Sequence, residues 1–370
     1  MIKIVQGNIV EADAEALVNT VNRVGYMGKG IALQFKQAFP KNFEAYAKAC
    51  RAHNVKPGEM FVFETGQLLG PKYIINFPSK RHWRGKSRIE DIESGLHALV
   101  QTVRKLNIKT IAVPPLGCGL GGLQWSVVEP MIRKAFANVP EVDLLLYVPH
   151  GSPPPAKMPV HTPRPAMTAA RAMLIKLMAQ YLELSYRMTL LEIQKLAYFL
   201  QEAGEPLRLR YHAGHYGPFA PNLNKVLERL EGHFIRGYGD QQKPDAEIAL
   251  LPGVVEEAEE FLRENDESRE RLARVAEIIE GFETPYGMEL LATVHWAARH
   301  AEPSATDESS AISAVSNWNE RKRQKFKEAH IRVAWQYPPG EPILKLAEAR
   351  GIFELFLART FVATSRKWQP

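Results

Sequence analysis

The feature that most limits how this chain can fold is an alternation of short apolar runs with longer amphipathic segments over residues 1–150. The short runs have the length of buried strands, whereas the longer segments, such as residues 30–50 and 88–106, repeat apolar residues with a helical period. This alternation predicts an α/β domain with three layers, α/β/α, around a mixed sheet. The strand-like runs are IKIVQGNI, EALVNTVN, MFVFET, KYIINF, TIAVPPLG and DLLLYVP.

A proline-rich stretch at residues 150–167 divides this part of the chain from the rest. Proline has no backbone donor and favours extended conformations, as in a semi-rigid linker. Beyond it, amphipathic runs of helical period dominate, up to a run at residues 341–358, and they predict a mostly α-helical second domain. We therefore expect a first domain over residues 1–152, a linker over 153–167 and a second domain over 168–370.

Cysteine content, hydropathy and charge restrict the setting in which the chain works. The 370 residues include two cysteines, Cys50 and Cys118, too few for a disulfide framework or a zinc cluster. No apolar run approaches the roughly 20 residues of a membrane span, and the first residues do not resemble a signal peptide. We therefore expect a cytoplasmic protein with no metal and no other cofactor. The formal net charge of +6 is compatible with a nucleic-acid partner.

Two glycine-rich loops each follow a strand-like run and precede a helical segment. They are NRVGYMGKGIA (residues 22–32) and PPLGCGLGGLQW (residues 114–125). Glycine lets main-chain N–H groups crowd round an anion, and the amino terminus of the following helix adds a favourable dipole. Neither loop matches the Walker A or the Rossmann pattern. One such loop alone would be interpreted as a tight turn, but the two together indicate a phosphate-binding site.

A basic cluster directly follows the apolar run in INFPSKRHWRGKSR. Its first cation, Lys80, could bind an anion, supply a reactive amine or be a solvated loop residue. Desolvation or the neighbouring Arg81 and Arg84 would lower its pKa from the usual value of about 10.4. His82 and Trp83 could stack on or hydrogen-bond a flipped-out base, although packing of the loop explains them equally well. Arg81, His82, Trp83 and Arg84 are therefore candidate DNA-binding residues.

Three motifs, GNIVEADAEALVNTVN, GYMGKGIALQFKQAFP and PPLGCGLGGLQW, together resemble the macrodomain, an α/β/α module that binds ADP-ribose. The resemblance covers roughly residues 1–150. The lysine in NFPSKRHW is similar to that of the macrodomain branch that removes ADP-ribose with a catalytic lysine. With a long helical second domain, the chain most resembles the DNA ADP-ribosylglycohydrolase antitoxins. Their partners are DarT-like toxins, which ADP-ribosylate thymidine in single-stranded DNA.

The resemblance implies roles for individual residues. Lys80 would be catalytic, Asn22 would orient the distal ribose, and Asn8 would replace an aspartate found at the adenine end of many macrodomains. In one related lysine-dependent hydrolase an aspartate follows the GCGL motif, whereas Gly121 stands here, which removes the obvious carboxylate acid or base. The expected ADP-ribose-binding residues are Asn8, Ile9, Asn19, Gly28, Lys29, Gly30, Ile31, Leu116, Gly117, Cys118, Gly119, Leu120, Gly121 and Gly122.

The second domain carries an acidic run that the resemblance links to toxin binding. A toxin that modifies single-stranded DNA needs a cationic groove, which a folded domain rich in carboxylates could occupy. Composition alone favours plain solvent exposure of the same run. The carboxylates in question are Glu256, Glu257, Glu259, Glu260 and Asp266.

Three functions remain open from the sequence. The first is hydrolysis of the N-glycosidic link between ADP-ribose and thymidine in single-stranded DNA, joined to a toxin-binding domain. The second is a hydrolase that releases ADP-ribose from glutamate esters of proteins, and the third is a reader that only binds ADP-ribose. In either hydrolase Lys80 could act as a neutral nucleophile or as an ammonium donor.

Overall fold

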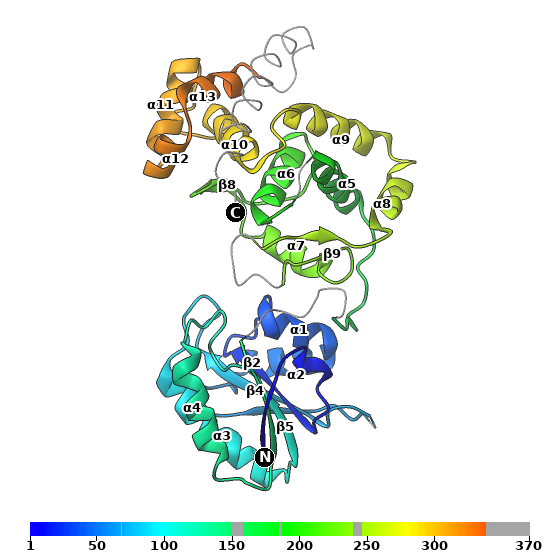
Figure 1. Cartoon of the computed structure of the whole chain (residues 1–370). Helices are drawn as coiled ribbons and strands as arrows, with labels where there is room; N and C mark the ends of the chain where they lie inside the picture. The colour runs from blue at the N-terminus through cyan, green and yellow to red at the C-terminus, as the bar shows by residue number, and fades with distance from the viewer. Residues whose placement is uncertain (68, 150–157, 185–186, 240–245, 338–370) are drawn as a thin grey trace, which may run out of the picture. The chain divides into compact units, whose positions relative to one another are not determined.

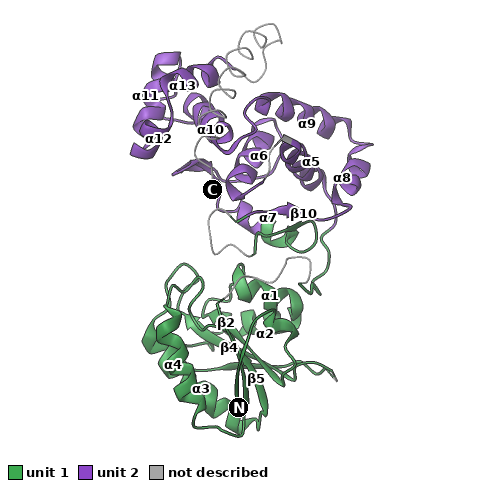
Figure 2. Ribbon diagram, viewed as in Figure 1, with its two compact units in different colours: residues 1–165, 227–246 green, residues 166–226, 247–370 purple. Residues whose placement is uncertain are grey.

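The computed structural model describes residues 1–67, 69–149, 158–184, 187–239 and 246–337. They form two compact units (Figure 2). The first part of the predicted linker and the predicted amphipathic run near the end of the chain lie outside the described residues. Unit 1 comprises residues 1–165 and 227–246, and unit 2 comprises residues 166–226 and 247–370.

The division between the units differs from the predicted domains in one respect. The boundary after residue 165 falls inside the predicted linker, but residues 227–246, expected in the second domain, group with unit 1. This grouping depends on tertiary contacts and not on a local pattern, so it cannot be predicted from the sequence.

Unit 1 is built on a mixed sheet in which the strand order is β1-β6-β5-β2-β4-β3 (Figure 1). β3 pairs antiparallel with β4 at one edge, and the other pairings are parallel. Each strand-like run of the sequence forms a strand, which confirms the predicted fold class. The strands are β1 (Ile2–Val5), β2 (Ala16–Asn22), β3 (Phe61–Glu64), β4 (Tyr73–Lys80), β5 (Thr110–Val113) and β6 (Asp143–Tyr147).

Helices cover both faces of this sheet, giving the three predicted layers. Because successive side chains of a strand point to opposite faces, Val18 and Ile75 join a buried cluster with residues of α3 and α4. Leu17 and Ile74 join a second cluster with Phe35 of α1. The helices are α1 (Gly30–Ala38), α2 (Pro40–Arg51), α3 (Ile89–Lys105) and α4 (Trp125–Phe136), with a short 3₁₀ helix η1 (Ile9–Glu11).

The segment over residues 30–50, which has one continuous helical period, forms two helices. Pro40 begins α2, and Phe39 before it has φ −132° and ψ 68°, outside the helical region. Proline disfavours the helical conformation in the residue that precedes it and is well suited to the first position of a new helix. The break therefore follows from Pro40.

Unit 2 is mostly helical in its described part, as predicted. The acidic run forms two helices, because the Asn265 side chain accepts a hydrogen bond from the Ser268 N–H and starts a new helix there. No helix in the described part of the chain is long and apolar enough to cross a membrane. The helices are α5 (Ala169–Leu184), α6 (Leu190–Glu202), α7 (Leu223–Leu230, its last four residues in unit 1), α8 (Val254–Leu262), α9 (Asp266–Ile279), α10 (Pro285–Arg299), α11 (Glu308–Trp318), α12 (Glu320–Lys325) and α13 (Glu328–Trp335).

The remaining strands are short. β7 (His212–Gly214) and β8 (Gly217–Phe219) pair antiparallel as a hairpin in unit 2. β9 (Ile235–Arg236) lies in unit 1 and β10 (Ala249–Leu250) in unit 2.

Candidate active site

The sheet brings the two predicted catalytic residues together at the carboxyl ends of β2 and β4. Asn22 and Lys80 are partners in this parallel ladder, after a register shift that follows Val21. The N–H of Arg23 donates to the carbonyl oxygen of Lys80 at 3.2 Å. Two residues from distant parts of the sequence therefore lie side by side where the parallel strands β2 and β4 end.

Lys80 reaches from β4 to the second glycine loop. Its side chain is half-buried, and its Nζ donates a hydrogen bond to the carbonyl oxygen of Leu120. Burial lowers the pKa of Lys80, because desolvation disfavours the ammonium form. Desolvation is thus the cause of the shift, and the expected contribution of Arg81 and Arg84 to it is absent.

Asn22 organises the start of the first glycine loop. Its Nδ2 donates to the carbonyl oxygen of Tyr26 at 2.6 Å, and its Oδ1 accepts from the N–H groups of Val24 and Tyr26 at 3.0 and 3.4 Å. The hydroxyl of Tyr46 donates to the Asn22 carbonyl oxygen. The buried Asn22 amide therefore fixes the turn that leads from β2 to Gly28.

The first glycine loop, residues 28–31, has no room for side chains at Gly28. A Cβ atom there would lie 2.1 Å from Oε1 of Glu228 and 2.6 Å from the Tyr26 ring. Gly30 begins α1 with φ +58°, in the left-handed region that favours glycine. Burial lowers the pKa of Lys29, and the Glu228 carboxylate opposes that change. Glu228 was not predicted as a site residue.

The second glycine loop holds its shape through close main-chain contacts. Gly117 and Gly122 have φ of +72° and +78°. At Gly121 a Cβ atom would lie 2.2 Å from the Gly117 carbonyl oxygen and 2.3 Å from Oγ of Ser87, whose N–H donates to the Gly121 carbonyl oxygen at 3.0 Å. The backbone conformation therefore requires glycine at positions 117 and 122, and close contacts require it at position 121.

This second loop also presents unused donors. Within residues 114–125, all of which the structure describes, the main-chain N–H groups of Gly119, Leu120 and Gly121 donate no hydrogen bond. The Ser87 hydroxyl beside them is buried and has no partner. A cluster of free donors at a glycine loop is the arrangement that binds phosphate oxygens. The loop therefore has the geometry expected of a diphosphate cradle.

Leu116 and Cys118 contribute packing to this loop. Leu116 is fully buried in the core cluster on the α3 and α4 face. Burial raises the pKa of the Cys118 thiol to about 11, so the thiol stays protonated near neutral pH. The Cys118 Sγ donates to the Leu116 carbonyl oxygen at 3.5 Å. Cys118 is therefore a packing residue of this loop and not an activated nucleophile.

At the other end of the expected ligand site, Asn8 keeps one amide group free. Its Oδ1 accepts from the Val10 N–H at 3.3 Å and caps η1, while its Nδ2 is buried without a partner. A free amide donor beside a ligand site suits the edge of an adenine ring. Ile9, next to it, packs into the core under the sheet.

Asn19, another expected ligand contact, lies in a buried network of side-chain amides. It is 0% exposed, and its Nδ2 donates to Oδ1 of Asn76 at 3.0 Å. Asn76 in turn exchanges hydrogen bonds with Asn42. This buried amide network ties β2 to β4 and α2, so the placement favours a structural role for Asn19 over the expected contact with ADP-ribose.

The basic cluster after β4 divides into a fixed part and an exposed part. Arg81 forms a two-pronged ion pair with Asp91 of α3, at 3.0 and 3.1 Å, which raises its pKa and occupies its guanidinium. The Trp83 ring, 43% exposed, lies 5.2 Å from the Tyr26 ring, and the Arg84 guanidinium lies 4.5 Å above it. Arg81 is therefore a structural cation, and the exposed stack is the part that suits a nucleobase.

His82 supports this stack. Its ring lies 5.5 Å from the Trp83 ring in a stacked arrangement, and its Nδ1 accepts from the Arg84 N–H at 3.2 Å. We refer to Tyr26, His82, Trp83 and Arg84 as the aromatic stack. His82, Trp83 and Arg84 follow Lys80 closely in the sequence, whereas Tyr26 comes from the turn before the first glycine loop.

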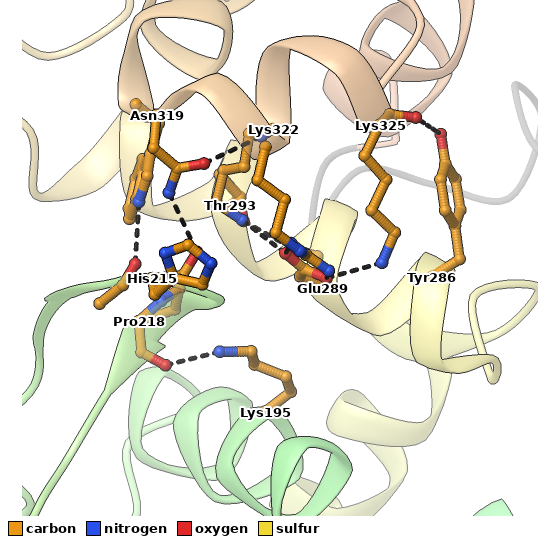
Figure 3. Close-up of polar contacts among 12 residues, drawn as sticks. Lys195, His215, Pro218, Tyr286, Glu289, Thr293, Asn319, Lys322 and Lys325 are labelled. Atoms are coloured by element: carbon orange, nitrogen blue, oxygen red, sulfur yellow. Dashed lines mark hydrogen bonds and ion pairs between the residues drawn. The ribbon is translucent and has the colours of Figure 1, made fainter. Parts of the chain in front are cut away.

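Unit 2 contains a buried charge cluster that the sequence did not reveal (Figure 3). Glu289 is fully buried and accepts hydrogen bonds from Arg321, Lys322 and Lys325. Burial opposes its ionisation, but these cations hold the pKa of Glu289 at about 2. Lys322 also donates to Oγ1 of Thr293 at 2.9 Å. The cluster joins α10 to α12.

A second buried lysine lies near this cluster. Lys195 of α6 donates to the carbonyl oxygen of Pro218 at 2.7 Å (Figure 3), and burial lowers its pKa to about 7. The tip of the same hairpin is held by Trp318 and Asn319, which donate to the carbonyl oxygens of Gly214 and His215. These contacts are those of a structural core. Among the described residues, no group of three His, Cys, Asp or Glu side chains is placed to hold a metal ion.

Comparison with known proteins defines the class and then the family. The Macro domain model matches residues 18–132, and the mixed sheet with its lysine between two glycine loops is that of a macrodomain protein. The DNA ADP-ribosyl glycohydrolase of Thermus aquaticus is 47% identical over 334 residues, covering 90% of this chain and 92% of that protein. The chain therefore belongs to the DNA ADP-ribosyl glycohydrolase family, as the sequence predicted.

Two other similarities concern parts of the chain. A DNA ADP-ribosyl transferase-DNA ADP-ribosyl glycohydrolase fusion protein of Thermosipho africanus is 34% identical over 163 residues, covering 40% of this chain and 42% of that protein. The solved macrodomain of Mycobacterium tuberculosis DarG is 55% identical, with a TM-score of 0.40, and covers 40% of this chain and 99% of that structure.

Proposed function

We propose that unit 1 hydrolyses the N-glycosidic link between ADP-ribose and thymidine in single-stranded DNA, with Lys80 as its catalytic residue. The position of Lys80 carries this proposal: it is paired with Asn22 in the sheet, and its amine contacts the second glycine loop. Cleavage of this link requires a route for the leaving group's proton and stabilisation of charge at the anomeric carbon. As an ammonium Lys80 can supply the proton, and as a neutral amine it can form a covalent bond to that carbon, so neither route requires a cofactor.

The two glycine loops and Asn8 would bind the ADP-ribose portion. The free N–H groups of Gly119, Leu120 and Gly121 would take the diphosphate. The unpartnered Nδ2 of Asn8 would contact the adenine. Binding therefore depends mainly on groups other than Lys80.

Lys80 has two chemically distinct ways to act. As a neutral amine it would attack the anomeric carbon of the ring-opened sugar, where the new carbon–nitrogen bond replaces the bond to the thymine nitrogen and the base leaves with a proton. Water would then hydrolyse the resulting imine, which releases ADP-ribose and restores the amine. As an ammonium it would donate a proton to the departing base. Burial lowers its pKa and so increases the neutral fraction at a given pH. A single-turnover rate that rises with pH through this pKa supports the amine, and one that falls supports the ammonium.

The rival substrate, an ADP-ribosyl ester of glutamate, is less consistent with the surroundings of Lys80. The exposed rings of the aromatic stack suit a nucleobase, whereas a protein ester has no flat group for them to contact. The chain belongs to the DNA ADP-ribosyl glycohydrolase family, which also supports a DNA substrate over a protein substrate. The same membership supports hydrolysis over binding of ADP-ribose alone.

We also propose that unit 2 binds a DNA ADP-ribosyltransferase toxin, as the fusion of both activities in one relative supports. The predicted contact by the acidic helices needs revision, because three of the five carboxylates named for it have cationic partners. Glu259 pairs with Lys176, Glu260 with Arg263 and Asp266 with Arg269. Paired surface charges attract a cationic groove less strongly than free ones. Glu256 is an exposed carboxylate of α8 for which no ion pair is formed among the described residues.

The experiment that tests the enzymatic proposal measures free ADP-ribose released from a labelled, ADP-ribosylated oligonucleotide. In the full chain, Lys80→Ala should abolish release and change the affinity for ADP-ribose by no more than about tenfold, roughly 1.4 kcal/mol. Retained turnover in this variant would contradict the lysine mechanism. Modified glutamate peptide serves as the parallel substrate, and faster release from it would favour the rival.

The same variant separates enzymatic from binding activity toward the toxin. If unit 2 binds the toxin, full-length Lys80→Ala should still suppress DNA modification in cells that co-produce the toxin. The complex should weaken as salt rises, since screening shortens the reach of exposed charges. Undiminished DNA modification in the presence of this folded variant would leave only the enzymatic route.

A further inference from the structure

Residues 227–239, here named the cover segment, belong to the same compact unit as the macrodomain and contact its first glycine loop. They include the end of α7 and β9. We propose that this segment is a displaceable cover whose own acceptor groups occupy the first loop and compete with the ADP-ribose diphosphate. This inference rests on the proposed ligand site.

The first observation is a hydrogen bond at the amino terminus of α1. The N–H of Gly30, the first residue of this helix, donates to the carbonyl oxygen of Gly239 at 2.7 Å. An N–H at a helix amino terminus that follows a glycine loop is a donor that a phosphate oxygen ordinarily takes. In this structure the cover segment already holds it, so a phosphate at this point has to displace Gly239.

The second observation is an anionic group on the same loop. Glu228 accepts a hydrogen bond from the Tyr26 hydroxyl, and its Oε2 lies 3.9 Å from Nζ of Lys36. Its Oε1 fills the place of the missing side chain at Gly28. The Glu228 side chain is 8% exposed, so its carboxylate acts at short range in a poorly solvated position. A diphosphate that approached the loop would meet this negative charge.

The cover segment is preshaped, and it is held both by polar contacts and by the fully buried side chains of Phe234, Ile235 and Tyr238. The Glu231 carboxylate accepts the N–H groups of Gly237 and Tyr238, each at 3.1 Å, and so fixes the curve of the segment. Attachment to α1 includes the amide of Gln37, which donates to the Glu231 carbonyl oxygen at 2.8 Å, and the Lys29 amine 5.3 Å from the Tyr238 ring. The contacts of Gly239 and Glu228 with the first loop are polar, so a ligand can exchange them while the buried side chains keep the segment attached.

A cover of this kind reduces the apparent affinity for ADP-ribose by the fraction of molecules in which the loop is open. Weakening the cover should therefore strengthen ligand binding. This is opposite in sign to the effect of damage to an ordinary binding residue, and that difference makes the proposal testable.

The experiment measures the Kd of the full chain for ADP-ribose by calorimetry. Glu228→Gln removes the charge and keeps the shape, and it should bind about three- to tenfold more tightly if the cover is then open more often. Gly239→Ala acts at another contact, because its Cβ atom would lie 2.8 Å from Cδ2 of Leu33, and it should also tighten binding. Glu270→Gln, an exposed position on α9, is the matched control and should leave Kd unchanged.

Hydrogen exchange gives a readout independent of affinity. Saturating ADP-ribose should accelerate amide exchange across residues 231–239 if the ligand displaces the cover. Unchanged or weaker binding by both variants, or slower exchange in the segment, would overturn the proposal. Failure of the wild-type chain and every variant to bind ADP-ribose would instead overturn the ligand site on which it rests.

Discussion

Two lysines, one in each unit, have a pKa lowered by burial, yet their surroundings differ. Lys195 is 2% exposed, has a pKa of about 7 and donates to the carbonyl oxygen of Pro218 inside a packed core. Lys80 is half-buried and lies between two glycine loops that present free or displaceable donors. A lowered pKa therefore does not by itself distinguish the lysine that we propose as catalytic. Access to a ligand site is the distinguishing feature.

The buried charges around Glu289 in unit 2 and the proposed ligand site of unit 1 also differ in how completely their polar groups are paired. In unit 2 the charges of Glu289, Lys322 and Lys195 each have a partner, as in a structural core. In unit 1 the Ser87 hydroxyl and one amide group of Asn8 are buried without a partner in the described structure. Unpaired groups of this kind are costly to keep unless a ligand uses them.

The largest effect that would sharpen this comparison is on stability. Glu289→Ala should lower the free energy of unfolding by about 3–5 kcal/mol, because it leaves the buried Lys322 ammonium without its counter-charge. Thermal unfolding followed by circular dichroism measures the loss. The exposed Glu270→Ala is the matched control and should change stability by less than about 0.5 kcal/mol. An unchanged melting temperature for Glu289→Ala would mean that the cluster does not hold unit 2 together.

A smaller effect is expected from the aromatic stack in unit 1. Trp83→Ala removes a partly exposed ring next to Tyr26 and Arg84, and should weaken binding of the modified oligonucleotide by about 1–3 kcal/mol, the usual contribution of one stacked base. Free ADP-ribose lacks the thymine that the Trp83 ring would contact, so the affinity of the variant for free ADP-ribose should not change. Equal losses for the oligonucleotide and for free ADP-ribose would assign Trp83 to the ADP-ribose pocket instead.

The smallest of the three effects concerns the second glycine loop. Gly119→Glu should bind ADP-ribose about tenfold more weakly, because a carboxylate beside the free N–H groups repels the diphosphate. Gly119→Gln has nearly the same size without the charge and is the matched control. Calorimetry compares the two variants, and identical affinities would move the diphosphate away from this loop.

The sequence predicted the elements that depend on local patterns. The strands of unit 1, the two strand-to-helix glycine loops and the position of Lys80 at the end of a strand were predictable, because each is encoded within a few residues. The break between α1 and α2 was not predicted, because the helical period of the segment is continuous across Pro40, the residue that causes the break.

The features that the sequence could not predict are contacts between distant residues. Arg81 was expected to face DNA, but its partner Asp91 lies on the next helix. Asn19 was expected to face ligand, but it hydrogen-bonds Asn76 of the neighbouring strand. Glu228 reaches the first glycine loop from far along the chain. In each case the partner is set by packing, which local periodicity does not record.

The central claim is that position at the ligand loops, and not a lowered pKa, makes a lysine catalytic in this chain. Its most direct test is single-turnover release of ADP-ribose from a modified oligonucleotide by Lys80→Met and Lys195→Met, with both variants confirmed as folded. We expect Lys80→Met to lose at least about 10³-fold in rate, roughly 4 kcal/mol, and Lys195→Met to retain the wild-type rate. A comparable loss in Lys195→Met, or a near wild-type rate in Lys80→Met, would contradict the account.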